Sequence, residues 1–160
     1  MLKNNRGFTL IEIVAVLIIL GIISAVVATR AGNNDVDLAA QTEVIKGHIR
    51  YAQTRAMATD DSPANLPTWG VCTNNTGTRY WLYNRDNTIP VPLPGQENAR
   101  VSLTDVGLTS MTVFDISFND WGVPFDPTGP LPLSANRSIT INDDGDSDTF
   151  TIIQQTGFVQ

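Results

Sequence analysis

One acidic side chain stands inside the most apolar stretch of this sequence. Glu12 is the only charged residue between Phe8 and Ala28. Taking a carboxylate out of water costs several kcal/mol unless a cation pairs with it. The position of Glu12 therefore predicts a functional carboxylate that meets a positively charged partner. The alternative interpretation is a plain signal anchor that carries a glutamate by chance.

The acidic segment near the C-terminus is the second candidate for chemistry. Residues 142–148 read Asn-Asp-Asp-Gly-Asp-Ser-Asp. Carboxylate oxygens crowded into one short loop suit Ca²⁺. The candidate ligands are Asp143, Asp144, Asp146 and Asp148. The segment lacks the distant Glu and the flanking helices of an EF-hand, so a solvated acidic turn between two strands is the alternative interpretation.

No set of residues for enzymatic catalysis stands out. His48 is the only histidine and Cys72 the only cysteine. A lone histidine without a second ligand nearby indicates a structural residue. Cys72 follows Trp69-Gly-Val in an apolar run without a flanking base, which indicates a buried thiol, and a single cysteine excludes a disulfide within the chain. We expect no enzyme, and no cofactor other than the candidate calcium.

The element that positions Glu12 is the apolar run over residues 7–28. A helix of this length spans about 30 Å, the thickness of a bilayer core. The preceding segment, Met1–Gly7, carries Lys3 and Arg6, and such a basic head holds an N-terminus in the cytoplasm. The run therefore predicts a membrane segment or a helix buried in an assembly.

The motif at the start of this run, Gly7-Phe-Thr-Leu-Ile-Glu12, resembles the signature of type IV prepilins and type II secretion pseudopilins. In that superfamily a short basic leader ends in Gly, and Phe-Thr-Leu-(Ile/Leu)-Glu then opens an apolar helix. The resemblance implies that a prepilin peptidase cleaves between Gly7 and Phe8 and that Phe8 is N-methylated. It also implies that Glu12 meets the Phe8 amine of a neighbouring subunit during assembly.

The charge of the chain limits its partners. The 160 residues carry a formal net charge of −6, and loss of Lys3 and Arg6 with the leader would change −6 to −8. An acidic chain repels nucleic acid, and the C-terminal segment 156–160 has no Lys or Arg. Nucleic acid is therefore not expected as a partner.

The residues beyond the apolar run predict one α+β head. From Val36 the pattern is that of an amphipathic helix, which Pro63 ends at the latest. The residues expected on its apolar face are Leu38, Val44, Ile45, Ile49, Ala52, Ala56 and Met57. Strands are expected over 68–73, 78–84, 100–104, 111–118, 137–142 and 149–154, with Pro- and Gly-rich loops over 88–98 and 125–134.

Three aromatic residues crowd the second of these strands. Tyr80, Trp81 and Tyr83 fall within four residues. A stacking platform for a sugar, for a nucleic acid or for electron transfer is one interpretation. Strand propensity and core packing explain the cluster more simply.

Two further stretches resemble the minor subunits of the GspH/FimT family. Residues 49–58, IRYAQTRAMA, are similar to the L-x-x-A-R-x-x-A helix end of that family, and Thr156–Val159 is similar to its terminal Thr-Gly-x-Val. The resemblance implies one long N-terminal helix whose amphipathic half packs on an antiparallel β-sheet head. The expected divisions are a cleaved leader (1–7), an apolar transmembrane or filament-core helix (8–30), an amphipathic helix of the head (31–62) and the β-sheet head (63–160).

The sequence thus predicts a pilin-like α+β structural subunit of a type IV pilus or a type II secretion pseudopilus. A minor pilin or pseudopilin is favoured over a major pilin subunit and over a DNA-binding minor pilin. The expected partners are other pilin or pseudopilin subunits and the prepilin peptidase. The chain is expected to cross the inner membrane once, with a periplasmic head, before it enters a filament in the periplasm or outside the cell.

Overall fold

The structure is a computed structural model that describes residues 9–30, 34–59, 66–126 and 131–160. Gly7 and Phe8, the expected cleavage and methylation residues, lie outside these ranges. The chain divides into two units, with the boundary between Asn34 and Asp35.

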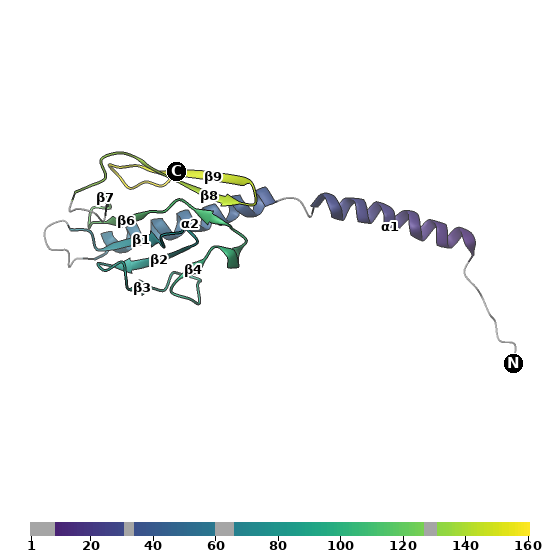
Figure 1. Ribbon diagram of the computed structural model, residues 1–160, viewed down its shortest axis with the longest axis horizontal. Helices are drawn as coiled ribbons and strands as arrows, with labels where there is room; N and C mark the ends of the chain where they lie inside the picture. The colour runs from purple at the N-terminus through teal and green to yellow at the C-terminus, as the bar shows by residue number, and fades with distance from the viewer. Residues whose placement is uncertain (1–8, 31–33, 60–65, 127–130) are drawn as a thin grey trace. The chain divides into compact units, whose positions relative to one another are not determined.

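The apolar run folds as the first helix, α1 (Leu10–Arg30), drawn in purple in Figure 1. Its first turn is closed by the Thr9 carbonyl, which accepts hydrogen bonds from the Glu12 N–H at 3.1 Å and the Ile13 N–H at 3.3 Å. Within the described ranges, no helix is both long enough and apolar enough to cross a membrane. The membrane span expected over 8–30 is therefore not confirmed.

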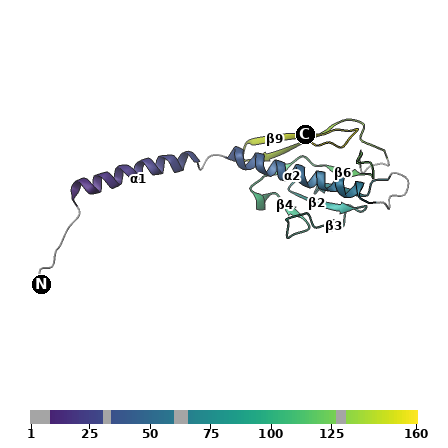
Figure 2. The same ribbon diagram turned by 180° about the vertical axis from the view of Figure 1, so that it is seen from behind.

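The second helix, α2 (Asn34–Met57), lies along the strands of the second unit (Figures 1 and 2). Its buried apolar side chains recur with the three- and four-residue spacing of one helix face. They are Leu38, Ile45, Ile49, Ala52 and Ala56, and none is more than 4% exposed. This stripe is the face that packs on the strands.

Two residues expected on that face are not part of it. Val44 is 42% exposed and Met57 is 50% exposed. Each is the sequence neighbour of a buried residue, Ile45 or Ala56, and one step along an α-helix rotates the side chain by about 100°. The prediction was wrong for these two positions because the apolar stripe is narrower than the sequence indicates.

Antiparallel strands in two sheets form the rest of the second unit. The first sheet has the order β3-β2-β1-β6-β7, with β4 also paired to β2. Its strands are β1 (Trp69–Thr73), β2 (Arg79–Asn84), β3 (Pro90–Val91), β4 (Val101–Ser102), β6 (Asp115–Phe118) and β7 (Pro124–Phe125). The second sheet has the order β5-β8-β9, with β5 (Ser110–Met111), β8 (Arg137–Asp143) and β9 (Asp146–Ile152). A helix packed on antiparallel strands confirms the expected α+β fold class.

The expected strand over 111–118 was wrong, because the chain passes there from one sheet to the other. The Thr112 N–H donates to the Thr140 carbonyl in β8 at 2.8 Å. Two residues later, the Phe114 carbonyl accepts a hydrogen bond from the Thr73 N–H in β1 at 2.9 Å. The segment therefore supplies β5 to the second sheet and β6 to the first.

Two other expectations are corrected in the same part of the chain. The strand expected over 100–104 is reduced to β4, and a 3-10 turn over Thr104–Val106 follows it. The loop expected over 88–98 contains the two-residue strand β3, which pairs with β2.

The hairpin between β1 and β2 depends on Asn74 and Gly77. The Asn74 Oδ1 accepts hydrogen bonds from the N–H groups of Thr78 at 2.8 Å and Arg79 at 3.0 Å. Gly77 has a φ of +65°, and a Cβ at this position would overlap the Met111 carbonyl oxygen. The turn therefore requires glycine.

All five residues of β1, the central strand of the first sheet, are buried. The side chains that pack with the α2 stripe include Val71, Leu82, Ile116 and Phe118. The second sheet adds Ile139, Ile141 and Ile152 to the same cluster. Among the described residues this core runs from Leu38 to Val159, so the second unit has a hydrophobic core of its own.

His48 has the structural position that its sequence context indicates. It lies on α2, is 7% exposed, and its Nδ1 is 2.9 Å from the Tyr80 hydroxyl oxygen. Burial lowers the pKa of His48 below its usual value, and a hydrogen bond with the Pro94 backbone only partly opposes this effect. The folded unit therefore holds the imidazole in its neutral form.

We expect the second unit to lose stability as the pH falls from about 7 to about 5. Because the pKa of His48 is lower in the folded state, the unfolded state binds more protons in this range, and the free energy of unfolding decreases. Urea unfolding of residues 35–160 at the two pH values measures the change. His48→Gln should flatten the pH dependence, since glutamine does not titrate.

Asp86, whose pKa is also shifted by folding, affects stability in a different pH range from His48. Hydrogen bonds from Thr88 lower the pKa of Asp86, so its contribution is lost only at more acidic pH, below about 4. An equal loss of stability in the wild type and in His48→Gln would contradict the assignment to His48.

Candidate assembly interface

α1 exposes apolar side chains on every side. Each of its described side chains, from Leu10 to Val26, is exposed. The twelve large apolar residues among them range from 40% exposed at Val14 to 81% exposed at Leu10. They are Leu10, Ile11, Ile13, Val14, Val16, Leu17, Ile18, Ile19, Leu20, Ile22, Ile23 and Val26.

Such a surface indicates an interaction site. A helix that is apolar all round is found in the interior of a large structure, and a continuous exposed apolar patch marks an interaction site. Burying one Val, Leu or Ile side chain contributes about 1.5–3 kcal/mol. Twelve such side chains give a strong and non-directional drive to associate.

Glu12 is the exception on this helix. Its carboxylate lies in the first turn, where the positive end of the helix dipole favours a negative charge. The other polar side chain described on α1, Ser24, donates its hydroxyl to the Leu20 carbonyl at 2.7 Å. Between Leu10 and Val26, Glu12 is thus the one polar side chain that makes no hydrogen bond or ion pair with described residues. Association that buries α1 must supply it with a partner.

The acidic segment forms the turn between β8 and β9. Asp143 pairs with Asp146 in the ladder, and Asp144 and Gly145 make the turn with positive φ angles of 34° and 111°. Asp148 uses its Oδ1 to accept the N–H of Thr149 at 2.8 Å. In the part of the chain that the structure describes, no three His, Cys, Asp or Glu side chains come together to hold a metal ion. Calcium binding stays a prediction.

The turn lies beside the start of α2. Leu38 and Ala39 line a small hollow of about 290 Å³ together with Asp146, Ser147 and Asp148. The N-terminal end of a helix carries partial positive charge, so nearby carboxylates are stabilising by about 0.3–1 kcal/mol each. The neighbouring start of α2 is therefore an alternative to a metal ion as the reason for an acidic turn here.

Thermal melting separates the two explanations. Bound Ca²⁺ is expected to stabilise residues 35–160 by RT ln(1 + [L]/Kd), about 2.7 kcal/mol at a hundredfold excess over Kd. Millimolar Ca²⁺ should then raise Tm more than matched Mg²⁺, and Asp146→Asn should remove the difference. Equal shifts with both metals would mean charge screening alone and would contradict the calcium prediction.

Comparison with known proteins gives one match, at the N-terminus. The family described as the prokaryotic N-terminal methylation motif matches residues 2–28. No curated protein and no solved structure matches the chain. The matched segment includes Gly7, Phe8, Glu12 and most of α1.

The match supports the type IV pilin and pseudopilin superfamily, and it points to a structural subunit rather than an enzyme. It implies processing by prepilin peptidase, interaction with other pilin subunits, and a membrane-anchored form that precedes a pilus form. The α+β arrangement of the second unit is pilin-like. The finer resemblance to the GspH/FimT family is not confirmed, because the match ends at residue 28.

Sequence reasoning missed one group of polar residues, on the face of the first sheet that points away from α2. Asn87 and Asp115 belong to no motif, and they become neighbours only when a loop folds over β1 and β6. The signal available in the sequence is the strand period of two, because successive side chains of a strand point to opposite faces. In β2 it places Trp81 and Tyr83 on the opposite face from Tyr80 and Leu82.

Proposed function

We propose that this chain is a structural subunit, a minor pilin or pseudopilin, of a type IV pilus or a type II secretion pseudopilus. The observation that carries the proposal is the exposed apolar helix α1 with its single unpartnered carboxylate, Glu12, among described residues. The methylation motif over the same segment supports it. The resemblance of 49–58 and Thr156–Val159 to minor subunits favours a minor over a major role.

In this proposal the chain is first held in the inner membrane by its apolar segment, with the second unit in the periplasm. Prepilin peptidase cleaves after Gly7, and the new Phe8 amine is methylated. α1 then leaves the lipid and packs among the helices of other subunits. There Glu12 pairs with the Phe8 amine of a neighbour, which offsets the cost of burying both charges.

The second unit is suited to remain outside this helical core. Its apolar residues are already buried in a core of their own, from Leu38 to Val159. Assembly through α1 therefore does not require the second unit to unfold or to exchange strands.

Mass spectrometry of the assembled or membrane fraction tests the processing step. We expect a mature chain that begins at N-methylated Phe8, without Met1–Gly7. Gly7→Val should block cleavage, because a branched side chain replaces the small residue before the cut. An intact Met1 in the wild-type filament, or a new N-terminus after the apolar run, would rule out the proposal.

Substitution of Glu12 tests the pairing. Removing one partner of a buried ion pair costs about 3–5 kcal/mol, so Glu12→Ala should reduce incorporation into filaments about a hundredfold or more. Glu12→Asp keeps the charge and should retain part of the incorporation into filaments. Ser24→Ala is the matched control on the same helix, since the Ser24 hydroxyl bonds only to Leu20.

The stability of the second unit is the second readout in this experiment. It should be the same in all three variants, because the core cluster of the second unit includes neither Glu12 nor Ser24. Incorporation of Glu12→Ala at the wild-type level would show that the pairing is wrong.

A further inference from the structure

The face of the first sheet that points away from α2 carries a polar network rather than an apolar core. Cys72, Tyr83 and Ser117 lie on this face and are 3%, 4% and 4% exposed. Burial raises the pKa of the Cys72 thiol and of the Tyr83 hydroxyl. Both groups are therefore neutral, and a ligand on this face would meet uncharged hydrogen-bonding groups at its base.

A tight loop after β2 fixes the edge of this face. The Arg85 N–H donates to the Thr68 carbonyl at 2.7 Å, and Arg85 has a φ of 62°, which is unusual for a residue with a side chain. The Asp86 Oδ1 accepts hydrogen bonds from both the N–H and the hydroxyl of Thr88. These hydrogen bonds define the path of the loop, which brings Asn87 over the sheet.

Asn87 connects the loop to two side chains of the sheet, and one of these, Asp115, extends the network to Tyr83. Its carbonyl accepts the Trp81 indole N–H at 2.7 Å, and its amide donates to the Asp115 Oδ2 at 2.7 Å. The other oxygen of Asp115 accepts the Tyr83 hydroxyl at 2.5 Å. Trp81 and Asp115 are thus held in place before any ligand arrives, which lowers the entropy cost of binding.

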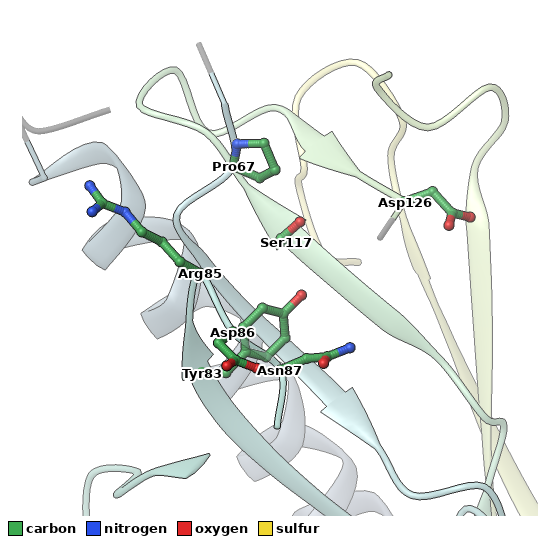
Figure 3. A pocket seen from close by; sticks show the side chains of 7 residues that line it. All are labelled: Pro67, Tyr83, Arg85, Asp86, Asn87, Ser117 and Asp126. Atoms are coloured by element: carbon green, nitrogen blue, oxygen red, sulfur yellow. The ribbon is translucent and has the colours of Figure 1, made fainter. Parts of the chain in front are cut away.

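Two adjoining hollows lie over this network. The smaller, of about 320 Å³, is lined by Tyr83, Asn87, Ser117 and Asp126 among others, and Figure 3 shows the first three on the sheet side with Asp126 across from them. The larger, of about 750 Å³, shares Asn87 and Asp126 and extends over Trp81. Ligand sites in proteins have about 300–1,000 Å³, so each hollow is of suitable size, and the two together form one groove.

The residues that line the larger hollow carry no net formal charge. Arg100 and Arg137 are balanced by Asp115 and Asp126, so a strongly charged polymer of either sign gains little. The uncharged polar side chains that line it are Thr73, Asn74, Asn75, Thr76, Asn87 and Thr88. Most of these side chains already hydrogen-bond within the protein, which holds them in fixed positions. The Asn75 amide makes no hydrogen bond with described residues, so it can both donate to and accept from a ligand rich in hydroxyl groups.

Trp81 and Arg100 supply a flat surface in the same hollow. The Arg100 guanidinium lies over the Trp81 ring at 4.8 Å from its centre. Arg100 is exposed and makes no hydrogen bond or ion pair with described residues, so its N–H groups are available to a ligand. The stacked guanidinium and indole form a flat surface with N–H donors at its edge. Such a surface suits a sugar ring, which has an apolar face and hydroxyl groups around its rim.

An extended peptide fits this groove less well than a sugar. Peptides commonly bind sheets by pairing with an exposed strand edge. The strands beneath the groove, β2, β1 and β6, each have partners on both sides, so the groove lies over a face and offers no edge. We propose that this groove, built on Trp81, Asn87 and Arg100, binds an uncharged oligosaccharide. The proposal does not depend on the filament role of α1.

Nuclear magnetic resonance of the ¹⁵N-labelled full chain tests this, in micelles of a zwitterionic detergent that contains no sugar. The probes are cellotetraose, chitotetraose and maltotetraose. At least one is expected to shift the Trp81 indole N–H signal in a saturable way. Trp81→Ala and Arg100→Gln should each weaken binding about tenfold, as loss of a central aromatic or arginine contact does.

Trp121→Ala is the matched control, because Trp121 is 74% exposed and does not line either hollow. It should leave the affinity unchanged. Arg100→Gln changes an exposed side chain and reports on the site even if Trp81→Ala does not fold. The proposal is overturned if no probe gives a saturable shift, if Arg100→Gln binds like the wild type, or if an uncharged Asn-Ser tetrapeptide shifts the same signals equally.

Discussion

The packing of α2 on the first sheet is the interaction on which the rest of the second unit depends. Ala52 and Ala56 are 0% exposed, and their small side chains let the helix approach the strands closely. Ile45 and Ile49 then fill the space between helix and sheet. This contact buries the face of the sheet toward α2.

The face of the first sheet that points away from α2 is organised around a glycine. Gly70 is the second residue of β1, and a Cβ there would overlap the Tyr83 ring and the Ile116 carbonyl oxygen. Glycine therefore lets Tyr83 lie flat against the strand and reach Asp115. Stability comes from the face toward α2, so the outer face is free to hold hydrogen-bonding groups in fixed positions.

Much of this arrangement could be predicted from the sequence, and the failures have physical causes. The motif around Glu12, the α2 helix and the two hairpins rest on local signals: periodicity, Asn and Gly in turns, and one charge in an apolar run. The crossing near Thr112 depends on hydrogen bonds to residues 28 positions away, and the groove depends on a loop that folds back over β1. Interactions at such distances leave no local pattern.

The exposed surface of α1 and its single carboxylate have different roles in association. Twelve exposed apolar side chains favour burial strongly but do not distinguish one position along a neighbouring helix from the next. An unpaired buried carboxylate costs several kcal/mol, and the position in which Glu12 meets a cation avoids that cost. In the proposed filament, the apolar surface would therefore provide the affinity, and Glu12 would select the register. A single carboxylate among the described α1 side chains would select a single register, which a regular filament requires.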